Sequence, residues 1–256
     1  MTAQLTLTAL PGIPLVEPGD DLPMIILEAY ARAGLTPTDD DVLIVAQKVV
    51  SKAENRYAYL GSIEPSAPAL ALADRTRTDP RLAELILRES REVVRQRPGV
   101  IIVEHRLGYV HANAGIDRSN IASDDDHDPR VLLLPADPDA SARLLRDNLR
   151  ERCGAELAVI INDSAGRAWR NGVIGFAIGC AGIEPLRDMI GQPDMFGRAL
   201  ERTQIALADE LAAAGSLLMG QASEGMPVVL ARGVQFSTSE VGSTPLIRAK
   251  HEDLFR

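Results

Sequence analysis

One apolar run that ends abruptly in polar residues constrains the fold more than any other feature of this chain. Residues 157–161 are continuously apolar, and residues 162–172 then carry an acid, a hydroxyl, glycines and arginines around the single tryptophan, Trp169. A short, fully apolar run is typical of a buried strand. We therefore expect the polar residues on the loop that leaves this strand, where binding side chains are commonly held.

The polar residues themselves allow two interpretations. Asp163 and Ser164 offer adjacent oxygen ligands to a hard cation, while Arg167 and Arg170 offer charge to a phosphate or carboxylate of an anionic substrate. The same residues would equally suit a polar turn with solvated arginines. The pattern alone does not decide between a site and a turn.

Strand-like and helix-like segments alternate along the chain, which predicts an α/β fold. Helix start and stop signals frame the first helix, because Asp20 and Asp21 precede an apolar-periodic stretch that Gly34 closes. The expected helices are 20–33, 79–94, 139–152 and, as the longest, 197–214. The expected strands are 4–10, 41–46, 100–103, 108–111, 131–134, 157–161, 173–178 and 228–231.

Composition limits the class of protein. A chain of 256 residues with 46% hydrophobic residues suits one large domain or two intimate lobes with a real core. The net charge of −9 disfavours nucleic acid and anionic membranes as partners, although it does not exclude a small anionic ligand. Cys153 and Cys180 lack the paired spacing of a disulfide framework, and no targeting or membrane-spanning segment is visible. We therefore expect a cytoplasmic protein.

Several residues are candidates for a site on residue type alone. Asp117 and Asp163 each follow a strand-like segment and could together hold Mg²⁺ or Mn²⁺, although spacing alone favours two turn caps. Lys52 could bind phosphate as a point charge, with a solvated helix lysine as the simpler alternative. His111 could act as a base, but packing is the more common role of a histidine at a strand end.

Two loops complete the candidates. Residues 219–226 contain two glycines, so their backbone could approach a ligand closely, or they could form an ordinary turn after a helix. No glycine-rich segment ends in the Lys-Ser or Lys-Thr of a P-loop. The acidic run 123–128 lacks the glycine and distal glutamate of a calcium loop, so we expect an exposed, mobile loop there.

Taken together, several segments resemble one known family. The most specific are the Asn-Ala-Gly-Ile-Asp sequence at 113–117 and the Asp-Ser-x-Gly-Arg sequence at 163–167. The matching segments occur in the family's order: 12–16, 50–54, 113–120, 132–135, 162–167, 172–179 and 218–225. On these residues the chain resembles the coenzyme F420:L-glutamate ligases, the γ-glutamyl ligases that add glutamate to F420-0.

The resemblance implies a fold and an assembly. It implies a family-specific α/β fold with a mixed sheet, two intimate lobes and an intertwined homodimer whose site lies near the subunit interface. Residues 1–256 would form a single ligase domain, without the nitroreductase-like C-terminal domain that is fused to some members. These are expectations that the structure and the comparisons can test.

The resemblance also implies a chemistry. GTP would phosphorylate the carboxylate of F420-0, and the amine of L-glutamate would then displace phosphate to form an amide, with GDP as the other product. Further γ-linked glutamates could follow. Two divalent sites, filled by Mg²⁺ or Mn²⁺, and a monovalent cation such as K⁺ would assist. Phosphoryl transfer of this kind depends on positioning and charge neutralisation, so it requires no protein nucleophile.

Particular residues inherit roles through the resemblance. Asp117 and Asp163 would bind one metal ion, Ser164 and Gln221 a second, and Lys52 would join the two aspartates in catalysis. Some relatives carry Glu at the position of Gln221, so this chain would have a less negative second site. Nucleotide contacts are implied for Ile13, Pro14, Leu15, Val16, Gln47, Lys48, Lys52, Asn120, Met219, Gly220, Gln221, Ala222, Ser223, Glu224, Gly225 and Met226.

Three other functions remain open on the sequence. The same metal–nucleotide site could serve an amide ligase that acts on another carboxylic acid. A metal-dependent phosphohydrolase would use water as the acceptor in place of the carboxylate. A nucleotide-binding sensor would bind without turnover. Phosphate release with each combination of F420-0 and glutamate separates these functions.

Overall fold

The computed structural model describes residues 4–121 and 129–255. The acidic run 123–128 lies outside the described residues. Across the described ranges, helices and strands alternate as the sequence predicts, so the α/β class is confirmed.

A mixed sheet forms the centre of the molecule, with the strand order β1-β12-β2-β8-β9. Its strands are β1 (Thr6–Ala9), β12 (Val228–Arg232), β2 (Val42–Ala46), β8 (Ala158–Arg167) and β9 (Arg170–Ala181). Only β2 and β8 pair in parallel, whereas the other neighbours are antiparallel. The predicted mixed sheet is therefore present, with β2 and β8 side by side at its centre.

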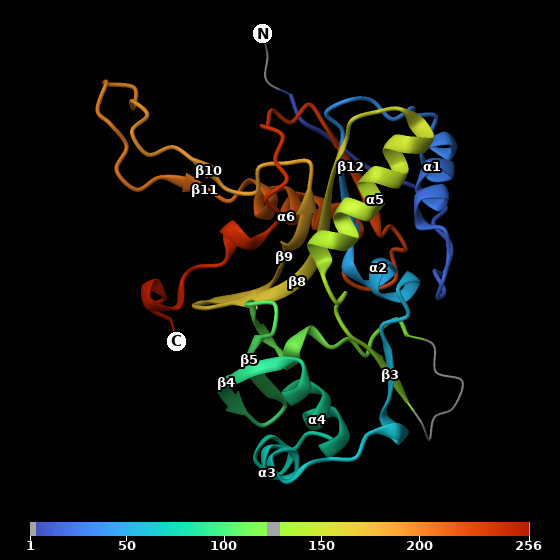
Figure 1. The fold of residues 1–256 in the computed structure, drawn as a ribbon, viewed down its shortest axis with the longest axis vertical. Coiled ribbons are helices and arrows are strands. Elements are labelled where there is room, and N and C mark those ends of the chain that lie inside the picture. The colour runs from blue at the N-terminus through green and yellow to red at the C-terminus, as the bar shows by residue number, and fades with distance from the viewer. Residues whose placement is uncertain (1–3, 122–128, 256) are drawn as a thin grey trace.

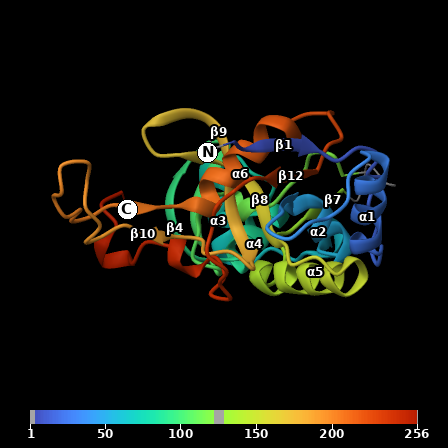
Figure 2. The same ribbon diagram turned by 90° about the horizontal axis from the view of Figure 1, so that it is seen from above.

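Helices cover both faces of this sheet (Figure 2). Helices α1 (Leu22–Arg32) and α5 (Pro138–Cys153) pack on one face, and α6 (Leu207–Met219) packs on the other. The short helix α2 (Gln47–Ala53) begins directly where β2 ends. This abrupt change from strand to helix places the polar residues of α2 at the end of the two central strands.

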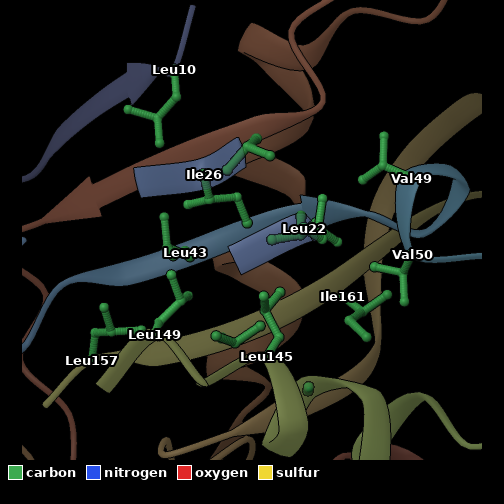
Figure 3. Packing of buried hydrophobic residues seen from close by; sticks show 14 of the residues in the cluster. Leu10, Leu22, Ile26, Leu43, Val49, Val50, Leu145, Leu149, Leu157 and Ile161 are labelled. Carbon is green, nitrogen blue, oxygen red and sulfur yellow. The ribbon is translucent and has the colours of Figure 1, made fainter. Parts of the chain in front are cut away.

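Strand alternation sorts the core residues between the two faces. Leu43 packs toward α1 and α5, whereas Ile44 packs toward α6. Figure 3 shows the first of these clusters, in which Leu145 of α5 lies beside Ile161 of β8 and Leu149 lies beside Leu157. Because both faces of β2 and of the first part of β8 are covered, residues 42–46 and 158–161 are apolar without interruption.

Local signals in the sequence explain the ends of α5. The Asp137 carboxylate accepts a hydrogen bond from the backbone N–H of Ala140 at 2.9 Å, and Pro138 occupies the first helical turn. Gly154 ends the helix in the left-handed conformation, with φ of 76°. These caps match the helix predicted over residues 139–152.

Two glycines of β9 let helices approach the sheet closely. A Cβ at Gly175 would lie 2.1 Å from Ser216 Oγ of α6, and a Cβ at Gly179 would lie 2.5 Å from the Pro138 backbone of α5. No side chain fits at either position without moving a helix. The small residues of β9 therefore set how tightly both helical layers pack on the sheet.

A second region lies below the large sheet in Figure 1 and has its own apolar cluster. It contains α3 (Ala67–Thr76), α4 (Pro80–Arg88) and a three-stranded sheet of β4 (Ser90–Arg97), β5 (Val100–His105) and β6 (Val110–Ala112). The short strands β3 (Tyr57–Tyr59) and β7 (Arg130–Leu132) pair between the two regions, whereas β10 (Arg187–Asp188) and β11 (Gln204–Ile205) pair in an arm that projects from the molecule. Single 3₁₀ turns occur at Leu60–Ser62, Asn113–Gly115, Thr244–Leu246 and Lys250–Glu252.

Two predicted helices were wrong in extent. The helix predicted over 79–94 ends at Arg88, because residues 90–97 pair as β4 with β5. The helix predicted over 197–214 starts only at Leu207, because residues 204–205 pair with β10 in an extended arm. In both cases pairing with a neighbouring strand outweighs the helical pattern of the segment itself.

The polar segment after residue 161 is not a loop, which corrects the first expectation of the sequence analysis. β8 continues to Arg167 and pairs with β9 residue by residue, so that Asp163 lies opposite Phe176. The turn falls only at residues 168–169. Asp163 and Ser164 are therefore held by sheet hydrogen bonds and not by a turn.

In the part of the chain described here, no helix is long and apolar enough to cross a bilayer.

Candidate functional site

A cavity of about 400 Å³ opens where β2 and β8 end. Five separate segments form its walls: the loop after β1, helix α2, the segment at Asn120, the middle of β8 and the loop after α6. All residues to which the resemblance assigns a nucleotide contact line this cavity. The remaining lining residues are Ala46, Val49, Asn162, Asp163, Ser164 and Pro227.

Asp117 does not line this cavity itself but contacts two residues of α2 that do. Its carboxylate accepts a hydrogen bond from the Gln47 amide and lies 3.0 Å from the Lys48 ammonium. Ser51 in turn donates to the Gln47 side-chain oxygen at 2.9 Å. Burial raises the pKa of Asp117, the Lys48 charge opposes that shift, and the charge of nearby Asp163 adds to it. Gln47 and Lys48 therefore lie between this carboxylate and the cavity.

Asp163 is buried on β8 and is held from two sides. One carboxylate oxygen accepts the backbone N–H of Ser164 at 2.8 Å, and the other lies 3.2 Å from Nε2 of His111. His111 comes from β6 in the second region, where its Nδ1 lies 3.0 Å from the Ala112 carbonyl. Burial lowers the pKa of His111, but the hydrogen bond and charge of Asp163 outweigh it, so the net shift is upward.

The oxygen atoms around Asp163 fit a hard divalent cation. Asp163 Oδ2 and Asn162 Oδ1 are buried, and neither is met by a donor in hydrogen-bond geometry within the described residues. Mg²⁺ and Mn²⁺ prefer such oxygen ligands. In residues 4–121 and 129–255, no three His, Cys, Asp or Glu side chains converge as a metal cluster. The two aspartates would therefore need hydroxyl, amide or phosphate oxygens to complete a coordination shell.

Lys52 links two loops at the mouth of the cavity. Its ammonium donates to the Asn120 carbonyl at 2.9 Å, and the Asn120 amide donates to the Ala222 carbonyl at 3.0 Å. Partial burial lowers the pKa of Lys52, while the charge of Glu17 opposes that shift. The lysine thus lies among the segments to which the resemblance assigns the nucleotide.

The loop after α6 is folded tightly around Glu224. Its carboxylate accepts the backbone N–H of Ala222 at 2.8 Å, and backbone hydrogen bonds of this kind lower the pKa of Glu224. Gly220 has φ of 72°, and a Cβ there would lie 2.0 Å from the Glu224 side chain. Gln221 lines the cavity beside it, as does Ser164 from β8. The loop backbone is thus folded back toward the cavity, so its peptide groups can approach a ligand.

The two arginines of the hairpin pair directly across it, but only one of them lines a cavity. Arg167 lines a second cavity beside the β8–β9 hairpin, whereas Arg170 lines neither of the two cavities. Sequence reasoning treated the two residues as equivalent because they are only three positions apart. The turn at 168–169 places them on opposite strands of the hairpin, at the paired positions where it closes.

Sequence reasoning gave little weight to two residues of the site. His111 was set aside as a packing residue, yet it lies against Asp163. Asn162 was not singled out, although it lines the cavity and donates to Ser216 Oγ at 3.1 Å. A polar residue directly after an apolar strand run was the available signal for Asn162, but no local signal connects His111 to Asp163.

Comparisons with known proteins agree with this arrangement. A family model described as F420-0:Gamma-glutamyl ligase matches residues 12–233. The chain therefore belongs to the F420-0:gamma-glutamyl ligase family, which defines it as a member of a class of ligases. Among curated relatives, the coenzyme F420:L-glutamate ligase of Methanothermobacter thermautotrophicus is 45% identical over 98% of this chain and 99% of its own length.

Other relatives have the same name and similar coverage. The coenzyme F420:L-glutamate ligase of Methanopyrus kandleri is 46% identical over 94% of this chain and 93% of its own length. That of Archaeoglobus fulgidus is 39% identical over 96% of this chain and 94% of its own length. The similarity therefore extends across both the sheet and the second region.

Proposed function

We propose that this protein ligates L-glutamate to F420-0 at the expense of GTP. The carboxylate of F420-0 would attack the terminal phosphate of GTP, releasing GDP and forming an acyl phosphate. The glutamate amine would then attack the acyl carbon, lose a proton and displace phosphate, which leaves an amide bond. The names of the relatives support the acceptor and the amino acid.

One observation carries the proposal. The segments to which the resemblance assigns the nucleotide come from distant parts of the chain, and they line a single cavity that also contains Asp163 and Ser164. A cavity of about 400 Å³ falls within the usual size of small-molecule sites. Both the nucleotide loops and the oxygen ligands are thus available at one place.

The residues would act by holding charge and position. Asp117, Asp163, Ser164 and Gln221 would hold divalent cations, which would supply charge neutralisation for the nucleotide phosphates. Lys52 would place an ammonium beside the same phosphates. Because phosphoryl transfer depends on such positioning, no protein nucleophile is needed. We include K⁺ dependence and the addition of further γ-linked glutamates in the proposal, and only the family resemblance supports these two points.

We also propose a homodimer. Large apolar side chains at the tips of two projecting segments support it: Met195 and Phe196 on the β10–β11 arm are 97% and 87% exposed, and Trp169 is 86% exposed. Figures 1 and 2 show that this arm extends away from the rest of the molecule. Exposed apolar side chains of this size are typical of surfaces that meet a partner. Light scattering of the wild type and of Phe196→Ser tests the assembly, and an unchanged monomer in both would contradict it.

Mass spectrometry and phosphate release test the reaction. F420-0 is incubated with the protein, GTP, Mn²⁺ and L-glutamate, and each component is omitted in turn, with K⁺ varied separately. We expect a mass increase of one glutamate residue that requires every component. Phosphate release without F420-0 would instead indicate a phosphohydrolase, and nucleotide binding without GDP formation would indicate a sensor.

Asp163→Asn tests the metal role directly. The substitution keeps the shape of the side chain and removes its charge, so we expect a folded protein that loses Mn²⁺ binding and ligase activity. Electron paramagnetic resonance of Mn²⁺ measures the binding independently of turnover. Near-normal Mn²⁺ affinity and turnover in this variant would remove Asp163 from the metal site.

A further inference from the structure

A second cavity, of about 280 Å³, lies beside the β8–β9 hairpin. Three segments that are distant in sequence enclose it: the turn at 108–110, the hairpin itself and the C-terminal segment 246–253. The C-terminal segment is held near the hairpin, since the rings of Trp169 and Phe255 lie 6.4 Å apart. This cavity is separate from the nucleotide cavity and has no role in the steps above.

The two cavities follow one another along the same strand. Asp163 lines the first, and Ala165 and Arg167 line the second. Ala165 pairs with Ile174, and Asp163 pairs with Phe176, so these four side chains share one face of the hairpin. At about 3.3 Å per residue, Asp163 and Arg167 are roughly 13 Å apart along β8. A single extended substrate could therefore contact both.

Aromatic side chains line the second cavity and continue to Asp163. The rings of Tyr109 and Phe176, which line the cavity, meet edge to face at 6.2 Å, and the ring of His111 lies 5.6 Å from that of Phe176. The Tyr109 hydroxyl donates to the Ile178 carbonyl, which fixes its ring. Because His111 also contacts Asp163, a continuous series of contacts runs from Phe176 in the second cavity to the Asp163 carboxylate. Such a surface suits a planar or apolar group.

Charge at the far end of the cavity suits an anion. Arg167 donates to the Gly172 carbonyl at 3.3 Å, and no carboxylate lies within ion-pair distance of its guanidinium in the described part of the chain. Arg248 lines the same cavity, as does the acid Asp253. Arg167 therefore keeps donors available for a phosphate or carboxylate, which guanidinium groups bind in a bidentate manner.

We propose that the second cavity binds the non-reacting part of the acid substrate, with Arg167 as its anion contact. The substrate would lie along β8, with its reacting carboxylate near Asp163, a planar or apolar portion against Phe176 and a second anionic group at Arg167. This inference rests on the proposed function, because it requires the acid substrate to react beside Asp163. It gives Arg167 a role that Arg170 does not share.

Steady-state kinetics with F420-0 test this proposal. In Arg167→Ala we expect the KM for F420-0 to rise about tenfold or more, with the KM for GTP and the affinity for Mn²⁺ unchanged. Arg167→Lys should recover part of the loss. Arg170→Ala is the matched control and should leave the KM for F420-0 within twofold of wild type. Equal effects of the two alanine variants, or a rise in the KM for GTP, would overturn the assignment.

A second pair of variants tests the cavity without removing an arginine. Ile174→Asp places a negative charge on the cavity face, whereas Val173→Asp places it on the opposite face of the same strand. Both positions are exposed, so we expect both variants to fold. Only Ile174→Asp should raise the KM for F420-0. If either Arg167→Ala or Ile174→Asp changes the oligomeric state in light scattering, the cavity is a subunit contact and the proposal fails.

Calorimetry separates this inference from the proposed function. In one outcome the wild type binds F420-0, Arg167→Ala binds it more weakly, and neither ligates glutamate. This result would contradict the proposed reaction but support the cavity as a binding site. In another outcome the wild type ligates glutamate and Arg167→Ala has an unchanged KM for F420-0, which would support the reaction and exclude the cavity as the substrate site. Failure of wild type both to bind and to ligate F420-0 would overturn both.

Discussion

His111 Nε2 lies 3.2 Å from Asp163 Oδ2, and this contact joins the second region of the molecule to the central sheet. His111 is on β6 and Asp163 is on β8, with 51 residues between them in the sequence. Both side chains are buried, and within the described residues neither atom is met by a partner in hydrogen-bond geometry, so the 3.2 Å contact is a close pairing of an imidazole with a carboxylate. The imidazole therefore orients the carboxylate that the proposed metal would use.

We expect His111→Ala to weaken Mn²⁺ binding about tenfold, because partners that orient a metal ligand commonly contribute that much to affinity. Titration of Mn²⁺ followed by electron paramagnetic resonance measures the change. His105→Ala is the control, since His105 is equally buried but lies 3.6 Å from Glu89, outside the cavity. Mn²⁺ affinity that is unchanged in His111→Ala, or lowered equally in the control, would contradict the orienting role.

Lys52→Ala should raise the KM for GTP by about tenfold, because an ammonium beside phosphate makes strong charge-assisted hydrogen bonds. The variant should also loosen the Asn120 loop, to which Lys52 donates. Initial rates at varied GTP concentration provide the test. Lys250→Ala removes a lysine that pairs with Glu92 away from the cavity and should leave the KM for GTP as in wild type. An unchanged KM in Lys52→Ala would remove Lys52 from the phosphate site.

Gly220→Ala should damage nucleotide binding more than Gly225→Ala. Both glycines have positive φ, so either alanine incurs a backbone cost of about 1 kcal/mol. Only at Gly220 would the added Cβ collide with Glu224, whereas nothing lies within 4 Å of a Cβ at Gly225. Isothermal calorimetry with GTP compares the two variants. Equal losses of affinity would mean that strain alone, and not the packing of Glu224, shapes this loop.

Glu84 should stabilise the second region in a pH-dependent way. Its carboxylate accepts hydrogen bonds from the Ser66 backbone N–H at 3.0 Å and from the Arg88 guanidinium at 2.8 Å. The hydrogen bonds from Ser66, together with the one from Arg88, lower the pKa of Glu84 to about 2. A depressed carboxyl pKa contributes stability above the unfolded value of 4.5, and this contribution is lost as the pH falls through about 2.

We therefore expect Glu84→Gln to lower the free energy of unfolding by about 1–3 kcal/mol at pH 7 and by less than half as much at pH 3. Urea unfolding at the two pH values measures both differences. Glu28→Gln removes an exposed pair with Arg32 and should change stability by less than about 1 kcal/mol. A Glu84→Gln difference that does not depend on pH would contradict the stabilising role of its charge.

Local patterns predicted much of the fold correctly. The α/β class and helix α5 between Asp137 and Gly154 follow from apolar periodicity and capping residues that act over short distances, whereas the mixed sheet was expected from the family resemblance. Residues 90–94 and 197–206 were mispredicted as helical, although residues 90–97 pair in a hairpin with β5 and residues 204–205 pair with β10. Apolar spacing in one segment does not show that the segment will pair with another strand.

The sequence by itself determined which residue types the site could use, and the resemblance grouped Asp117, Asp163, Lys52 and the loop at 219–226 into one chemistry. Only the tertiary structure decided their surroundings. It continued β8 through Asp163, placed His111 against that carboxylate, and gave Arg167 but not Arg170 a place in the second cavity. The reason is physical: a side chain's neighbours across a sheet or between two regions are set by strand pairing and packing, which join positions that are far apart in the sequence.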